Sequence, residues 1–105
     1  MLNVKDLNGT PVLELREDVD VFTADGVFAR LRQAVNEEDS FVVSFEHCRY
    51  CDSSGIANIV RLIKSGRRFA IVALGQIRRT LELTRIHTLV PVVSNVPEAV
   101  EQLKR

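Results

Sequence analysis

The sequence predicts an α/β protein with a mostly parallel central sheet of four to five strands, an N-terminal β-hairpin and about four helices. Short apolar segments alternate with segments whose apolar residues recur at helical spacing, in the order β-β-α-β-α-β-α-β-α. Such alternation implies right-handed crossovers, which place parallel strands side by side under a cover of helices. The chain has 105 residues, 46% of them hydrophobic, and we expect one domain over residues 1–105.

The first two strands are expected to pair as a hairpin. They cover Leu2–Val4 and Val12–Leu15, and the Asn8-Gly9 pair between them favours a tight hairpin turn. A helix is predicted next, from Thr23 to about Val35, with Thr23 as its capping residue and Asp25 in its first turn. Its apolar face is expected to contain Ala24, Val27, Phe28, Leu31, Ala34 and Val35.

A buried strand and a second helix follow, separated by a polar loop. The strand covers residues 41–45, the loop covers 46–55, and the helix runs from about Ser54 to Ser65, where Gly66 ends it. The predicted inner stripe of this helix consists of Ile56, Ile59, Val60 and Ile63, and its other faces carry Asn58, Arg61 and Lys64.

The remaining third of the chain is predicted to contain two strands and two helices. A buried strand covers residues 69–74, and a short helix over 76–83 carries Arg78 and Arg79 outward. A last strand over 89–93 is expected at the sheet edge, because Pro91 lacks the N–H that a central strand needs. The final helix, from Asn95 to Arg105, begins with an Asn95–Glu98 pair that resembles a capping box. Its inner stripe is Val96, Ala99, Val100 and Leu103.

Charge is balanced over the whole chain but not along it. Fourteen Lys and Arg oppose fourteen Asp and Glu, so the formal net charge is zero. Residues 1–54 hold five basic and eleven acidic residues, a net charge of −6, whereas residues 55–105 hold nine basic and three acidic ones, a net charge of +6. Either the halves interleave in space, or the protein has one acidic and one basic surface suited to a charged protein partner.

Several classes of protein are disfavoured by the sequence. The zero net charge argues against binding nucleic acid through overall charge. The chain has no run of about 18 apolar residues and no apolar signal core in its first twelve residues, so we expect a cytoplasmic protein without membrane insertion. It has no phosphate-binding loop, HExxH or nucleophile elbow, and His47 and His87 fit no metal-ligand pattern. We therefore expect no enzymatic activity, cofactor or metal.

Cys48 and Cys51 have the CxxC spacing of redox sites and precede a predicted helix. A single pair does not supply the four ligands of structural zinc, and two cysteines do not make a disulfide framework. We interpret both as small loop residues and keep a CxxC redox protein as an alternative.

The most informative segment is Asp52-Ser53-Ser54-Gly55, at a strand-to-helix junction. A helix N-terminus offers free N–H groups and a partial positive charge, and Asp, Ser and Gly are ordinary capping residues there. Two adjacent serines behind an aspartate suggest more than capping, because a hydroxyl at such a corner is accessible to a kinase. A phosphate would add about −1.5 to −2 charges. Beside Asp20, Glu46 and Asp52, it would repel an acidic or closely packed partner.

Over nearly its whole length, the sequence resembles the STAS domain family, in its bacterial anti-sigma factor antagonist branch. The most specific match is Asp52–Ile56, which is similar to the family's D-S-S-G-[LI] phosphorylation motif. Asp20–Ala24 resembles the family's L-D-x-x-T-A segment, with Val19 in place of the Leu. Arg78–Thr84 and Val93–Val100 resemble the family's third helix and the start of its last helix.

The resemblance implies a phosphorylation-switched binding module. The unphosphorylated domain would bind an anti-sigma factor with serine kinase activity and so release the sigma factor. Phosphorylation of the first motif serine, here Ser53, would break that complex, and a PP2C-type phosphatase would restore it; Ser54 is the alternative phosphorylation site. The implied partner-binding residues are Asp20, Thr23, Asp52, Ser53, Ser54, Gly55 and Asn58.

One departure and two alternatives accompany this hypothesis. Arg85 stands where family members commonly have Gly, which is expected to affect the loop after the third helix. A STAS interaction module with another partner, such as a stressosome scaffold or a lipid-transport ATPase subunit, is compatible with the same motifs. Nucleotide binding at the Ser53 corner has no supporting motif.

Overall fold

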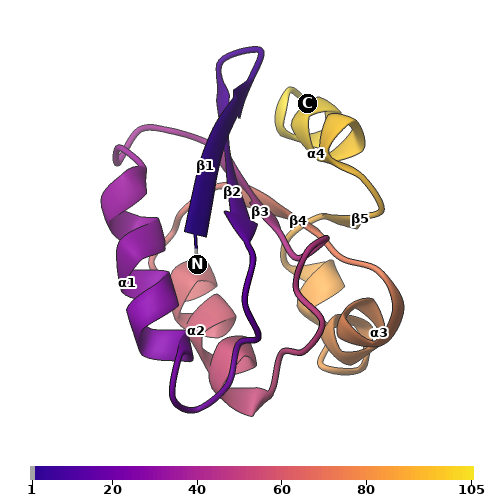
Figure 1. Cartoon of the computed structure of the whole chain (residues 1–105). Coiled ribbons are helices and arrows are strands. Elements are labelled where there is room, and N and C mark those ends of the chain that lie inside the picture. The colour runs from indigo at the N-terminus through magenta and orange to yellow at the C-terminus, as the bar shows by residue number, and fades with distance from the viewer. Residues whose placement is uncertain (1) are drawn as a thin grey trace.

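The computed structural model describes residues 2–105 and confirms the predicted fold class, a five-stranded, mostly parallel sheet with helices on both faces (Figure 1). Met1 lies outside the described residues. The strands stand in the sheet in the order β1-β2-β3-β4-β5. Their bounds are β1 (Leu2–Leu7), β2 (Thr10–Leu15), β3 (Phe41–Ser44), β4 (Phe69–Val72) and β5 (Val92–Val93). The helices are α1 (Ala24–Ala34), α2 (Ser53–Lys64), α3 (Gly75–Leu83) and α4 (Val96–Leu103), with a short 3-10 helix, η1 (Ile86–Thr88).

The N-terminal hairpin is confirmed, and it is longer than predicted. β1 pairs antiparallel with β2 from Leu2 opposite Leu15 to Leu7 opposite Thr10. Asn8 and Gly9 between them both have left-handed backbone, with φ of +53° and +88°, as the tight turns of hairpins require. The extra length was missed because β1 is an edge strand, whose exposed polar residues interrupt the apolar pattern.

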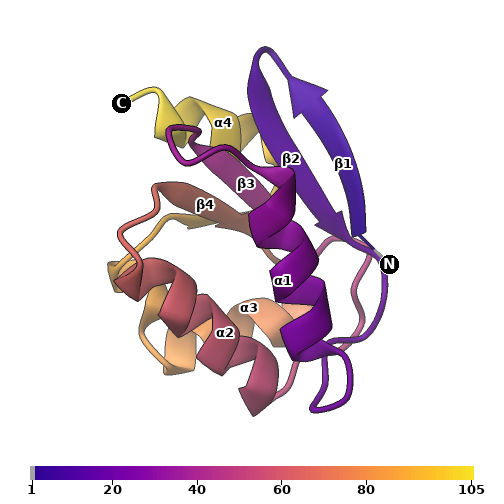
Figure 2. The ribbon, with the colours of Figure 1, turned by 90° about the vertical axis from the view of Figure 1, so that its left-hand side faces the viewer.

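Side chains that alternate along the strands build two separate cores, one on each face of the sheet. Figure 2 shows helix α4 on one side of the sheet and helices α1 and α2 on the other. The helices α1, α2 and α3 cover the first face, where Leu13, Val43 and Ile71 are buried. Helix α4 covers the second face and packs Ala99 and Val100 on the other set of strand residues, Val12, Val42, Ala70, Val72 and Val93. No helix within residues 2–105 has the length and apolar character that crossing a bilayer requires.

Strands β2, β3, β4 and β5 run parallel, so their carboxyl ends meet at one end of the molecule. The segments after β2 and β3 lead from this end into α1 and α2, and both helices begin there, at the lower edge of Figure 1. Loops at the carboxyl ends of parallel strands are where α/β proteins commonly bind their partners. We call this the carboxyl end of the sheet.

The last strand was predicted over residues 89–93, but the first three of these residues lie outside it. Ile86–Thr88 form the unpredicted 3-10 helix, and the carbonyl of Ile86 accepts hydrogen bonds from the backbone N–H groups of Leu89 (2.9 Å) and Val90 (3.1 Å). The chain therefore enters the sheet only after Pro91, and β5 occupies the edge position that Pro91 indicated. Arg85, the position at which the sequence resemblance implied Gly, has a φ of +63°, a left-handed backbone that Gly adopts without strain.

The predicted inner stripe of α2 is partly wrong. Ile59 is buried as expected, but the stripe also contains Leu62, Gly55 and Asn58, whereas Ile56, Val60 and Ile63 are only partly buried. In α1 the predicted face is confirmed for Ala24, Val27, Phe28, Leu31 and Val35, and Ala34 is exposed. The stripe of α4 is confirmed for Ala99 and Val100, with Val96 and Leu103 partly buried beside them.

Candidate functional site

The Asp52–Gly55 corner lies at the start of α2, at the carboxyl end of the sheet. Asp52 is the N-cap residue, and its Oδ1 accepts a hydrogen bond from the backbone N–H of Ser54 at 2.8 Å. Ser53 is the first residue of the helix, and it is exposed. Ser54 is half-buried, and its carbonyl accepts a hydrogen bond from Asn58 Nδ2 at 3.0 Å. Of the two serines, Ser53 is therefore the more accessible to another protein.

Gly55 is buried in the first turn of α2, where this helix packs against the segments that follow β2 and β3. A Cβ atom at this position would overlap the Sγ of Cys51 and lie 2.8 Å from Cγ1 of Val19. Val19 and Cys51 form an isolated parallel bridge, in which Val19 N–H donates to the Tyr50 carbonyl (2.8 Å) and Asp52 N–H to the Val19 carbonyl (3.0 Å). The glycine thus lets α2 pack directly on this bridge.

The Asp20–Thr23 loop is braced by its own side chains. Asp20 Oδ1 accepts hydrogen bonds from the backbone N–H groups of Phe22 (2.8 Å) and Thr23 (3.1 Å). In return, Thr23 Oγ1 accepts from Asp20 N–H at 3.0 Å and donates to the Asp18 carbonyl at 2.9 Å. Thr23 occupies the N-cap position of α1, but its hydroxyl does not cap the helix as predicted, because it is engaged in this loop.

Asn58 was expected on a face of α2 other than its inner stripe, and that expectation is wrong, because only 1% of its surface is accessible. Its Nδ2 donates to the Ser54 carbonyl and to Asp25 Oδ1, each at 3.0 Å, and its Oδ1 accepts from Arg61 Nη1 at 3.1 Å. The hydrogen bond from Asn58 lowers the pKa of Asp25, and the Arg61 guanidinium, 3.7 Å away, adds to this effect. Asn58 therefore ties α1 to α2 beneath the surface.

A shallow hollow of about 300 Å³ lies between the two helix starts. It is lined by Val21, Asp25, Ser53, Ser54, Ala57 and Arg61. The structure thus brings the Asp20–Thr23 loop and the Asp52–Gly55 corner together, although about thirty residues separate them. Of the Asp20–Thr23 loop, only Asp20 and Thr23 were singled out from the sequence, and Asp25 and Arg61 were not named as site residues. A further signal is the apolar pair Val21-Phe22, which fits neither a strand nor a helical stripe.

Acidic residues gather around this hollow. Asp18 and Asp25 are exposed, and Asp20 and Asp52 are half-buried. The Arg61–Asp25 ion pair joins the two oppositely charged halves of the chain. Other pairs stay within one half, for example Lys5 and Arg16 with Glu14, Arg30 with Glu17, and Arg78 with Glu82. Most of these ion pairs therefore do not join the two halves, and four aspartates of the acidic half lie in the segments that lead into α1 and α2 or at the start of these helices.

The family model for the STAS domain matches residues 1–99. The chain belongs to the STAS domain family. A comparison with curated protein sequences gave no significant match.

Solved structures share the fold of this STAS domain at low sequence identity. An anti-sigma factor antagonist from Mycobacterium paratuberculosis superposes with a TM-score of 0.90 at 19% identity, covering 100% of this chain and 94% of that one. The phosphorylated form of SpoIIAA, a Bacillus cell fate determinant, gives 0.66 at 15% identity and covers 98% and 99%. The murine anion transporter Slc26a9 gives 0.75 at 10% identity; the match covers 95% of this chain and 18% of that one.

The two cysteines of this STAS domain are free and buried, at 7% and 8% exposure for Cys48 and Cys51. Burial raises the pKa of both thiols, that of Cys51 to about 12, with a further contribution from Cys48. A redox CxxC site instead stabilises the thiolate and lowers the pKa. Their environment supports the interpretation of both as small packed loop residues.

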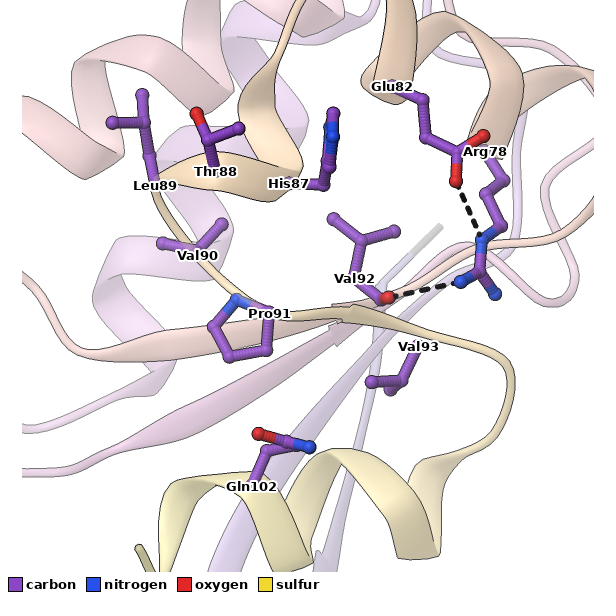
Figure 3. A pocket seen from close by; sticks show the side chains of 10 residues that line it. All are labelled: Arg78, Glu82, His87, Thr88, Leu89, Val90, Pro91, Val92, Val93 and Gln102. Atoms are coloured by element: carbon purple, nitrogen blue, oxygen red, sulfur yellow. Dashed lines mark hydrogen bonds and ion pairs between the residues drawn. The ribbon is translucent and has the colours of Figure 1, made fainter.

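A second and larger hollow, of about 440 Å³, lies beside β5 on the STAS domain (Figure 3). Its exposed rim carries Glu82 and His87 from the segment before the strand, with Gln102 of α4 on the opposite side. Arg78 Nη2 donates to the outward carbonyl of Val92 at 3.3 Å, and Arg78 Nη1 donates to Ser94 Oγ at 2.7 Å. Arg78 thus covers the open edge of the sheet, and its polar groups are already paired within the chain.

Proposed function

We propose that this STAS domain is a cytoplasmic, single-domain anti-sigma factor antagonist controlled by phosphorylation of Ser53. The unphosphorylated protein binds an anti-sigma factor that is a serine kinase and thereby frees the sigma factor. Phosphorylation of Ser53 breaks the complex, and a PP2C-type phosphatase restores it. The observation that carries the proposal is the exposed hydroxyl-bearing residue Ser53 at the first position of α2, within the family motif Asp52–Ile56.

The surroundings of Ser53 suit a charge-operated switch. A phosphate here adds about −1.5 to −2 charges. It enters a surface that already holds Asp18, Asp20, Asp25 and Asp52, with Arg61 as the cation in the same hollow. A partner surface that accommodates the neutral serine in close contact would face both added bulk and added repulsion. The added phosphate should therefore strongly weaken binding at an interface but change the stability of the fold little, since Ser53 is exposed.

The comparisons support the class of function. The Mycobacterium protein is described as an anti-sigma factor antagonist, and so is SpoIIAA, which has been solved in phosphorylated and unphosphorylated forms. We extend that description to this chain as part of the proposal, together with its partner kinase and phosphatase.

Phosphoryl transfer tests the proposal directly. The purified chain is incubated with ATP and, one at a time, the anti-sigma factor kinases of its source organism, and the peptide covering residues 50–61 is analysed by mass spectrometry. We expect one phosphate on Ser53, full modification of Ser54→Ala and none of Ser53→Ala. Phosphate on Ser54 alone would show that the site is assigned one residue too early.

Binding measurements by calorimetry complete the test. The variant Ser53→Asp is expected to bind the kinase about five- to 150-fold more weakly, or about 1–3 kcal/mol, whereas Ser53→Ala retains affinity. Binding without any phosphoryl transfer would contradict the switch and favour an interaction module with another partner, such as a stressosome scaffold.

A further inference from the structure

The carboxyl end of the sheet exposes an aromatic side chain that packing does not explain. Phe22 is 93% exposed and the adjacent Val21 is 68% exposed, whereas Phe28, Phe41 and Phe69 are fully buried. Single exposed apolar residues are common on proteins, but two adjacent ones beside a candidate contact site are a typical mark of an interaction surface. Tyr50, 53% exposed, extends the apolar character to the neighbouring loop.

The backbone beneath Phe22 is held in place before any partner arrives. Asp20 Oδ1 accepts from the Phe22 N–H at 2.8 Å, and the reciprocal Asp20–Thr23 bonds close the loop around it. The bridge between Val19 and Cys51 then fixes this loop to the chain that leads into Ser53. The backbone of such a braced loop loses little conformational freedom on binding, so only the rotamer of the Phe22 side chain has to be fixed.

The neighbours of Phe22 indicate the chemistry of the surface that covers it. Val21 lines the same hollow as Asp25 and Ser53, and Phe22 follows it on the same loop, next to the candidate phosphorylation site. Asp25 lines this hollow, and the exposed Asp18 precedes the loop, where its carbonyl accepts a hydrogen bond from Thr23 Oγ1. The complement of such a patch is an apolar pocket with a basic rim.

We propose that Phe22 is the anchor residue with which this domain docks on the anti-sigma factor kinase, inserting its ring into an apolar pocket that basic residues surround. This inference rests on the proposed function and goes beyond it, because it assigns the binding energy to a residue outside the phosphorylation motif. The ring and the acidic flank act separately: the ring contributes contact that salt does not screen, and the carboxylates contribute attraction that salt weakens.

The test compares Phe22→Ala with a matched control by calorimetry against each purified anti-sigma factor kinase, with ADP present so that no phosphoryl transfer occurs. Leu83→Ala is the control, since Leu83 is also an exposed apolar residue, 77% accessible, at the far end of α3. We expect Phe22→Ala to weaken binding at least tenfold at both low and high salt, and Leu83→Ala to stay within twofold of the wild type. In Asp18→Asn, affinity should depend less on salt while the ring contribution remains.

Several outcomes would overturn the inference, and they are distinguishable from failure of the proposed function. If the wild type binds a kinase and Phe22→Ala binds equally well, the anchor is refuted and the proposed function stands. If Leu83→Ala weakens binding as much as Phe22→Ala, the effect is not specific to the loop and the anchor is again refuted. If Phe22→Ala only abolishes self-association in analytical ultracentrifugation, a second copy is the occupant. If the wild type binds no kinase, both proposals fail.

Discussion

Asn58 and Asp25 show how a single buried amide group can hold the groups of an exposed surface in place. The amide satisfies Asp25 and the Ser54 carbonyl together, so it fixes the first turn of α2 relative to α1. The charged form of Asp25 is favoured by this bond, and its folded-state pKa lies below the ordinary value of an aspartate. The resulting stabilisation is complete above the unfolded-state pKa and is lost as the pH falls through the lowered folded-state value.

This arrangement predicts the behaviour of Asp25 in Asn58→Ala. The pKa of Asp25, followed by NMR titration of its carboxyl carbon, should rise toward the ordinary aspartate value, because the largest lowering contribution is removed. The remaining Arg61 charge should keep the shift incomplete, and Arg61→Ala should produce a smaller rise. An unchanged pKa of Asp25 in Asn58→Ala would show that the interhelical hydrogen bond does not form in solution. Gln33→Ala, an exposed amide on α1, serves as the control.

At the scale of elements, the position of α2 depends on contact between Gly55 and the Val19–Cys51 bridge. We expect Gly55→Ala to destabilise the protein by about 1–3 kcal/mol in urea unfolding, because the added methyl group overlaps Cys51 Sγ and crowds Val19. The double variant Gly55→Ala/Cys51→Ala should recover part of that loss, because the overlapping sulfur is gone. Strict additivity of the two substitutions would contradict direct contact between these positions.

The order and type of the elements were predictable because buried strands read as apolar runs and helices show their own period. The bounds of the two edge strands, β1 and β5, were not predictable, since polar residues and a proline break the apolar pattern there. The same limit applies to the site. Ser53 was proposed from its motif and stays a prediction, whereas the burial of Asn58 depends on a carboxylate from another helix that no local pattern reveals.

For the whole molecule, one phosphate on Ser53 changes the net charge from zero to nearly −2 at neutral pH. We expect the isoelectric point to fall measurably while the melting temperature changes little, because the exposed Ser53 contributes nothing to either core. Chemical shift changes in NMR spectra should be confined to the Asp20–Thr23 and Asp52–Gly55 segments and the residues that line their hollow. Changes spread through α4 would indicate that phosphorylation acts by altering the fold.

The agreement between strand order and chain order has a consequence for how the molecule forms. Each strand is added beside the one completed before it, so the growing sheet never waits for a later segment to insert between two earlier ones. The sheet can therefore form progressively from its N-terminal hairpin during synthesis. The temporary open edge moves along the sheet until β5 is made, and Arg78, already synthesised in α3, then covers the last outward carbonyl at Val92. The edge at β5 is thus covered as soon as this strand pairs, before α4 is complete, and β1 remains the other edge strand.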